Sequence, residues 1–173
     1  MKEKYEQYSQ FYQRMTKNVR NHPSLIRFLV VADKFFAFAF AVIYPASLLF
    51  LFLNQPFSWL LAFNKIGLPA CCFVAVSGLR ILIKRPRPYE KVGAGIDSIA
   101  KKRKGGNSIP SRHVASAFVI SMVLLPEILW LGITLLISSF CLGALRIFLG
   151  VHYPSDVFLG GVIGLLFGAI GLL

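Results

Sequence analysis

The sequence predicts an all-α integral membrane protein, a bundle of about five transmembrane helices preceded by an interfacial amphipathic helix at the N-terminus. Three observations support this fold class. The chain has 173 residues, of which 56% are hydrophobic, and a mean hydropathy of +0.66. These values lie well above those of soluble domains. The apolar residues also gather in runs close to the about 20 residues that a helix needs to cross a bilayer. Polar and proline-containing segments separate these runs.

The charge distribution favours anionic membrane lipids as partners and argues against nucleic acid. The chain carries 19 Lys and Arg against 7 Asp and Glu, a net charge of +12. These charges lie at the edges of the apolar runs, where they can reach anionic lipid head groups. The three cysteines all fall inside apolar runs and lack the spacing of metal ligands. We therefore expect no disulfide framework, no metal site and no cofactor.

Residues 1–24 are expected to form a segment of their own, followed by a membrane domain over residues 25–173. Helical spacing places five apolar side chains of this segment on one stripe: Tyr5, Tyr8, Phe11, Tyr12 and Met15. Such a helix can lie flat in the interface, with Lys17 and Arg20 reaching the head groups. A frayed soluble tail is the alternative. Ser24 is a suitable N-cap for the first membrane span.

Five apolar spans follow in the membrane domain. We expect them at about 25–53, 57–83, 111–125, 128–149 and 155–173. Turn signals separate neighbouring spans at Asn54-Gln55-Pro56 and at Pro126-Glu127, and Asn64-Lys65 softly interrupts the second span. A division of residues 25–83 into three short spans would leave almost nothing for the turns. The last span is rich in glycine, which predicts close helix packing; its glycines include Gly160, Gly161, Gly164 and Gly168.

The only long polar connection runs from about residue 84 to residue 110. It contains Arg85-Pro-Arg87-Pro88 and the basic run Lys101-Lys102-Arg103-Lys104. That run either faces lipid head groups or contacts the substrate, and the sequence favours neither. With five spans, this connection, the start of the third span and the connection before the last span all emerge on one side. Three polar clusters therefore converge at one membrane face.

The last of these clusters holds the parts of a phosphoryl-transfer site. Arg146, His152 and Asp156 recur at intervals of six and four residues between two apolar runs. An arginine can clamp phosphate oxygens with its forked guanidinium. A histidine can act as nucleophile or proton carrier when another group fixes its tautomer. The aspartate, one helical turn further on, could be that group.

Three motifs in order resemble those of the type 2 phosphatidic acid phosphatase (PAP2) superfamily. The family patterns are Lys-x6-Arg-Pro, Pro-Ser-Gly-His and Ser-Arg-x5-His-x3-Asp. The matching segments are Arg80-x6-Arg87-Pro88, Pro110-Ser111-Arg112-His113 and Arg146-x5-His152-x3-Asp156. The resemblance covers residues 80–156 and implies a PAP2/haloperoxidase-like helical core.

The resemblance implies a role for each matched residue. His152 would be the nucleophile that attacks phosphorus and forms a phosphohistidine, and Asp156 would hold its ring. His113 would protonate the leaving oxygen and then activate water. The phosphate oxygens would be held by Arg80, Arg87, Ser111 and Arg146. Arginines would then supply the positive charge that a metal ion supplies elsewhere.

The sequence departs from the family patterns at three positions. Arg80 replaces a lysine, which keeps the charge but changes its shape. Arg112 replaces a glycine and could add a phosphate contact or narrow the substrate entrance. Leu145 replaces a serine, so one hydroxyl is missing. None of these changes removes the nucleophile, the general acid or the orienting carboxylate, so we expect an active enzyme whose substrate preference is open.

The predicted function is that of a metal-independent membrane lipid phosphatase. Small bacterial members of the family often act on undecaprenyl diphosphate, which makes this lipid the first candidate; phosphatidylglycerophosphate and phosphatidic acid are alternatives. Transfer of the phosphoryl group to another lipid, or lipid binding without catalysis, are further alternatives. The resemblance implies a bacterial cell membrane. Basic residues near the site favour a cytoplasmic face, whereas the family resemblance slightly favours an outward face. The oligomeric state is open.

Overall fold

The regular structure of the described residues is entirely helical. The computed structural model describes residues 2–90, 98–99 and 106–172. Its α-helices are α1 (Lys2–Arg20), α2 (Pro23–Asn54), α3 (Trp59–Ala62), α4 (Leu68–Ile83), α5 (Arg112–Leu124), α6 (Leu129–Phe148) and α7 (Pro154–Ile170). A π-helical turn, η1 (Phe63–Gly67), joins α3 to α4, and a 3₁₀ turn, η2 (Pro88–Glu90), follows α4. The basic run at residues 101–104 lies outside the described residues.

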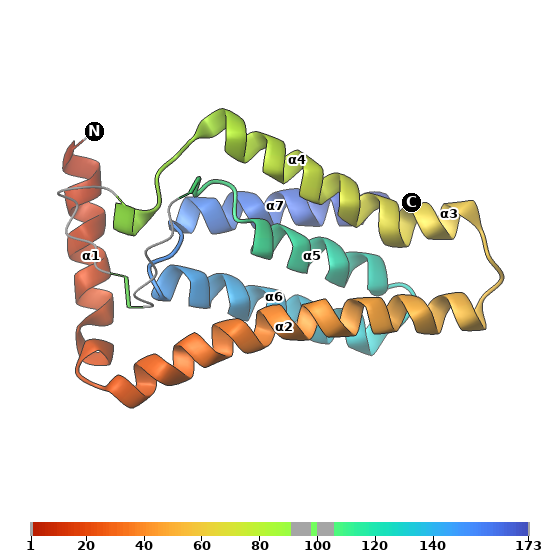
Figure 1. Ribbon diagram of the computed structural model, residues 1–173, viewed down its shortest axis with the longest axis horizontal. Helices are drawn as coiled ribbons and strands as arrows, with labels where there is room; N and C mark the ends of the chain where they lie inside the picture. The colour runs from red at the N-terminus through yellow and green to blue at the C-terminus, as the bar shows by residue number, and fades with distance from the viewer. Residues whose placement is uncertain (1, 91–97, 100–105, 173) are drawn as a thin grey trace.

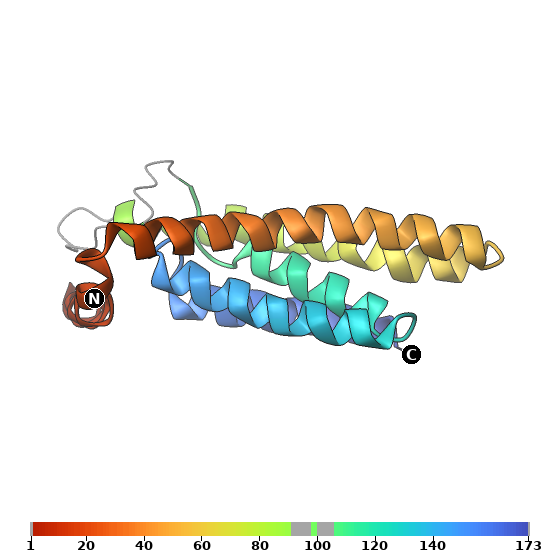
Figure 2. The same ribbon diagram turned by 90° about the horizontal axis from the view of Figure 1, so that it is seen from below.

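The helices form an elongated bundle with α1 laid across one end (Figure 1). Figure 2 shows α5 between a layer of α2 and α4 and a layer of α6 and α7. Within the described residues, three helical segments are long and apolar enough to cross a membrane, namely Pro23–Asn54, Trp59–Glu90 and Leu129–Phe148, and α5 and α7 are shorter apolar helices. Large apolar side chains such as Phe28, Phe35 and Phe38 are more than 60% exposed on the outside of α2. An outer surface of this kind suits lipid, and the predicted helical membrane fold is confirmed.

The helix boundaries agree with the predicted spans, with one correction at the start of α2. The N-cap is His22 and Pro23 is the first helical residue, so Ser24 is not the cap. Proline suits the first turn because its missing N–H would have no partner there. The predicted interruption at Asn64-Lys65 is the π-helical turn η1. Lys65 turns inward from it, donates to the Val123 carbonyl at 2.8 Å and pairs with Glu127 at 2.9 Å.

Helix α1 forms as predicted and packs against the protein with Tyr8, Tyr12 and Met15 of the predicted stripe, together with Thr16 and Val19, whereas Phe11 faces outward. Tyr12 is fully buried and its hydroxyl donates to the Phe148 carbonyl at 3.2 Å. Thr16 is also fully buried, whereas Phe11 is 56% exposed. The helix therefore covers the end of α6, which a frayed tail would not do. The division into residues 1–24 and 25–173, and a position of α1 in the lipid interface, stay predictions.

The glycines of α7 let its backbone approach α5 closely. A Cβ atom added at Gly160 would lie 2.7 Å from the Ser111 carbonyl oxygen, and one at Gly164 would lie 2.5 Å from the Ala115 carbonyl oxygen. The Ser111 amide donates to the Asp156 carbonyl at 2.9 Å at the same end of the bundle. The predicted close packing of the last span is confirmed, and it brings the starts of α5 and α7 together.

Replacement of Gly164 by alanine is expected to lower the free energy of unfolding by about 1–3 kcal/mol, the usual range for overpacking. The added methyl group would meet backbone of α5, which cannot move aside as a side chain can. Gly78→Ala in α4 is a matched control because no atom lies within 4 Å of its added Cβ. The control should be neutral or stabilising by up to about 1 kcal/mol. Denaturant unfolding in detergent measures both, and equal stabilities for the two variants would contradict the packing.

Candidate active site

His152 and Asp156 form an imidazole–carboxylate pair at the end of the bundle that α1 covers. His152 lies in the short connection between α6 and α7, and Asp156 lies in the first turn of α7. Both side chains are buried, and His152 Nδ1 is 3.6 Å from Asp156 Oδ2. Ser108 lies beside the pair: its hydroxyl donates to Asp156 Oδ2 and is 3.5 Å from His152 Nδ1. Because Nδ1 faces this group, Nε2 is the nitrogen left for chemistry.

Arg85 is a member of this cluster that the sequence analysis did not single out. Its Nη1 lies 2.9 Å from Asp156 Oδ1 and 2.7 Å from Ser155 Oγ. Its guanidinium carbon lies 3.9 Å from the centre of the Tyr153 ring, a cation–π contact. Arg85 falls in the unspecified part of the first motif. Its place two residues before Arg87 in an Arg-Pro-Arg-Pro segment was the only available signal.

Two of the predicted phosphate ligands contact protein oxygens in this structure. Arg80 donates through Nη1 to the Pro110 carbonyl at 2.9 Å and through Nη2 to the Asn107 carbonyl. It therefore holds the segment that leads into α5, and its fork suits several carbonyls better than a lysine would. Arg146 Nε lies 2.7 Å from Asp33 Oδ1, and both side chains are buried. Their contact with phosphate stays a prediction.

The other two predicted ligands keep buried polar atoms without a partner. The Ser111 hydroxyl and Arg87 Nε are buried and make no hydrogen bond within the part of the chain that the structure describes. Ser111 is the N-cap of α5, yet its side chain makes no capping bond. A buried donor without a partner costs about 1–3 kcal/mol. A phosphate oxygen is an acceptor that would satisfy both groups, next to the helix start that favours an anion.

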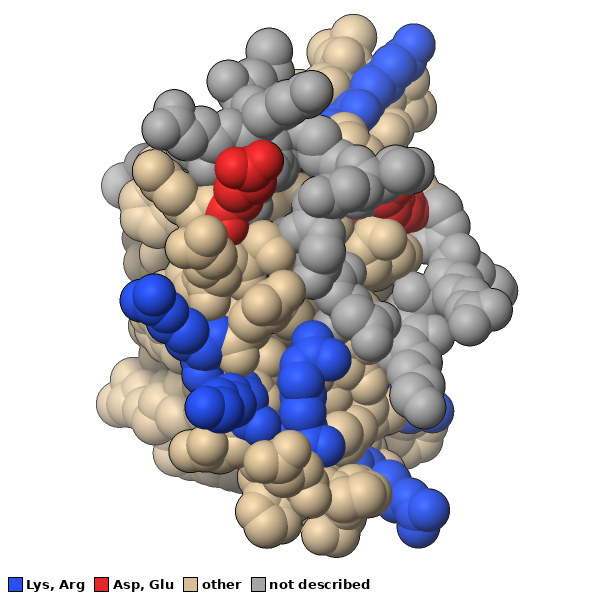
Figure 3. Space-filling view, turned by 90° about the vertical axis from the view of Figure 1, so that its left-hand side faces the viewer, with Lys and Arg blue, Asp and Glu red and all other residues tan. Residues whose placement is uncertain are grey.

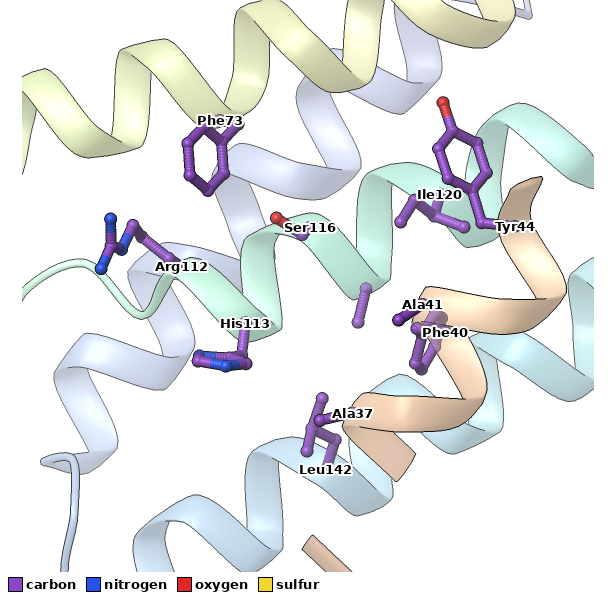
Figure 4. Close-up of a pocket in the computed structure, with 11 residues that line it drawn as sticks. Ala37, Phe40, Ala41, Tyr44, Phe73, Arg112, His113, Ser116, Ile120 and Leu142 are labelled. Carbon is purple, nitrogen blue, oxygen red and sulfur yellow. The ribbon is translucent and has the colours of Figure 1, made fainter. Parts of the chain in front are cut away.

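His113 and Arg112 lie at one end of an apolar pocket of about 370 Å³ (Figure 4). The Arg112 guanidinium is 5.7 Å from the centre of the Phe73 ring. The remaining lining residues are mostly apolar and come from α2, α5 and α6: Ala37, Phe40, Ala41, Tyr44, Ser116, Ala117, Ile120 and Leu142. His113 is exposed, unlike His152. It thus lies between a lipid-like space and the polar end of the bundle.

The surroundings of His152 favour its neutral form. Burial lowers the pKa of the imidazole, the hydrogen bond to Asp156 opposes this effect, and the charges of Arg87 and Arg146 lower the pKa further. A neutral imidazole is what a nitrogen nucleophile requires. Basic side chains also dominate the described charged surface at this end of the molecule (Figure 3).

These features define an α-helical membrane protein with a buried histidine–carboxylate pair among basic side chains at one end of its bundle. The sequence model of the PAP2 superfamily matches residues 57–173. The chain belongs to this superfamily, as its three motifs predict.

Comparison with known proteins agrees with this assignment. The chain is 33% identical over 136 residues to lipid A 4'-phosphatase of Bacteroides thetaiotaomicron; the match covers 69% of this chain and 57% of that protein. The chain thus spans little more than half of this relative. The crystal structure of Aquifex aeolicus LpxE has a TM-score of 0.71 at 30% identity, covering 94% of this chain and 93% of the other. A transmembrane PAP2-type phosphatidylglycerolphosphate phosphatase from Bacillus subtilis has a TM-score of 0.65 at 20% identity, covering 94% and 83%, which supports the fold.

Proposed function

We propose that this PAP2 protein hydrolyses a phosphate ester on a membrane lipid through a phosphohistidine and without a metal ion. The observation that carries the proposal is that two buried donors, Arg87 Nε and the Ser111 hydroxyl, have no partner among the described residues. They occur at the same end of the bundle as the His152–Asp156 pair. A phosphate held by them would be within the reach of a buried nucleophile, with an apolar pocket next to His113.

In the first step, His152 Nε2 attacks phosphorus, an N–P bond forms and the bond to the lipid oxygen breaks. His113 gives its proton to that oxygen, so the lipid leaves as an alcohol or, from a diphosphate, as a monophosphate. In the second step, His113 takes a proton from water, the water oxygen attacks phosphorus and the N–P bond breaks. Inorganic phosphate leaves and His152 is regenerated. The roles follow the general logic of nucleophilic and acid–base catalysis.

Positive charge near the phosphate would stabilise the transition state. Phosphoryl transfer spreads negative charge over the equatorial oxygens, so preorganised cations supply most of the catalysis. Arg87 and Arg146 both lie close enough to act on the pKa of His152. Asp156 would stabilise the imidazole as it gains charge in the first step.

We propose a phosphorylated glycolipid of the lipid A type as the first substrate class to test. The support is the similarity to a lipid A 4'-phosphatase. Undecaprenyl diphosphate, the candidate inferred from the motifs, is the competitor, followed by phosphatidylglycerophosphate and phosphatidic acid. We further propose that the site faces outward, since the family's polyprenyl diphosphate phosphatases usually do.

Purified protein in detergent is expected to release free phosphate from lipid A faster than from the three other lipids, each given at equal concentration. A chelator should leave the rate unchanged, because the arginines provide the charge. Radiolabelled donor lipid separates hydrolysis from transfer: labelled free phosphate supports a phosphatase, and a labelled second lipid supports a phosphotransferase. A higher rate on undecaprenyl diphosphate would reassign the substrate, and no release from any lipid would favour a lipid-binding protein.

A further inference from the structure

Arg85 connects three groups around the carboxylate of the site. Its Nη1 donates to Asp156 Oδ1 at 2.9 Å and to Ser155 Oγ at 2.7 Å, and its guanidinium lies over the Tyr153 ring. Tyr153 in turn packs against Tyr8 of α1, with 5.1 Å between ring centroids. A guanidinium held by a ring on one side and two oxygens on the other has little rotational freedom. Arg85 is therefore a fixed donor.

The two oxygens of Asp156 have different partners. Oδ2 accepts from the Ser108 hydroxyl and from the Tyr153 amide, and it is the oxygen nearest His152 Nδ1. Oδ1 accepts from Arg85. Without Arg85, Oδ1 would be a buried carboxylate oxygen with no donor among the described residues, and only the Ser108 hydroxyl and the Tyr153 amide, both on Oδ2, would hold the carboxylate. With one anchored oxygen, the carboxylate plane could turn out of line with the imidazole while Oδ2 stays next to Nδ1.

We propose that Arg85 is a positioning residue that fixes the Asp156 carboxylate toward His152 and offsets part of the negative charge that this carboxylate presents to the imidazole. This proposal rests on the proposed function, because its purpose is to prepare His152 for attack on phosphorus. Arg85 itself need not touch the phosphate. It differs in this respect from Arg87, whose Nε has no partner in the described part of the chain.

The Arg85–Asp156 pair is close to neutral as a whole, so it attracts a proton on His152 less than a lone carboxylate would. Arg87, before η2, and Arg146 of α6 also disfavour a protonated imidazole at His152. Arg80 of α4 and Tyr8 of α1 interact with Asp156, and burial raises the pKa of the Tyr8 hydroxyl, which keeps it neutral. Removal of Arg85 therefore leaves Asp156 as a stronger proton-holding partner of His152.

Arg85→Ala is expected to lower kcat by a factor on the order of 10², as a misplaced catalytic group does, with little change in KM. The acid limb of the pH–rate profile, which reports protonation of His152, should move to higher pH in this variant. In the wild-type protein that limb should lie below the ordinary histidine value of about 6.5, because burial lowers the pKa of His152. Arg85→Lys keeps the charge but loses the forked guanidinium and the ring contact. Its acid limb should therefore lie close to the wild-type pH, while its kcat should stay below the wild-type value.

Arg27→Ala is the matched control, since Arg27 is an exposed arginine near the start of α2. It should change neither kcat nor the acid limb. A rise of KM at constant kcat in Arg85→Ala would overturn the proposal and assign Arg85 to phosphate binding. If Arg85→Ala gives less folded protein, but the folded fraction keeps the wild-type kcat and acid limb, Arg85 is only a structural contact. This result would also overturn the proposal.

A titration by NMR separates this proposal from the proposed function. Protein labelled with ¹⁵N-histidine reports the pKa of the His152 ring without any substrate, and His152→Ala assigns its signal among the three histidines. If no lipid is hydrolysed by the wild-type protein, the proposed function fails, and the titration still decides the role of Arg85. A higher pKa of His152 in Arg85→Ala supports the proposal, and an unchanged pKa overturns it.

Discussion

His152→Ala is expected to lower phosphate release by at least ~10⁴-fold, the scale on which removal of a nucleophile acts in other enzymes. The remaining arginines and Ser111 would still bind phosphate, so lipid binding should persist in this variant. The structure supports this separation because the proposed phosphate ligands take their described contacts from groups other than the imidazole: Arg80 is held by carbonyls and Arg146 by Asp33. Phosphate release in detergent and lipid binding by equilibrium competition measure the two effects.

His22→Ala is the matched control for this experiment. His22 is exposed at the N-cap position of α2, and its side chain makes no capping hydrogen bond. Its replacement should leave phosphate release unchanged. Vanadate, a phosphate mimic, should inhibit the wild-type protein. Turnover in His152→Ala equal to that of the wild type would remove the phosphohistidine mechanism.

Asp33→Ala is expected to lower the free energy of unfolding by about 3–5 kcal/mol, the usual cost of breaking a buried ion pair from one side. Asp33 is 2% exposed and Arg146 is 5% exposed, and their charged atoms are 2.7 Å apart. Removal of the carboxylate would leave the guanidinium buried without its counter-charge. The pair also joins α2 to α6, so activity should fall with stability. Denaturant unfolding in detergent gives the stability.

Two further variants make this prediction specific. Lys34→Ala, at the neighbouring exposed position of α2, should stay within about 0.5 kcal/mol of the wild type. The double variant Asp33→Leu/Arg146→Met removes both charges and should recover most of the stability, because two apolar groups leave no buried charge. It should remain inactive if Arg146 also stabilises the phosphate. An Asp33→Ala protein as stable as the wild type would show that the ion pair contributes nothing.

The sequence was sufficient for the fold and for membership of the PAP2 superfamily, and it supplied the site residues that stay predictions. Apolar runs have to form helices in a bilayer because every backbone polar group must be satisfied within the segment. The spans could therefore be placed to within a few residues, and glycine spacing predicted the close contact of α5 and α7. The motifs could be placed at one end of the bundle because the parity of the span count fixes the side on which each connection emerges. The pairing of His152 with Asp156 was predicted from their spacing of four residues, although His152 lies in the connection before α7 and not on the helix itself.

Only the tertiary structure decided which partner each charged group has. Arg80 and Arg87 have the same predicted role in the first motif, yet Arg80 is held by carbonyls of the segment before α5 while Arg87 Nε has no partner among the described residues. Asp33 lies 113 positions from its partner Arg146, and Arg85 lies 71 from Asp156. Helix periodicity relates residues a few positions apart, whereas these contacts arise from the way separate helices and connections pack. Local pattern therefore determined the helices and the catalytic candidates, and packing decided which arginines hold the protein together and which remain available for phosphate.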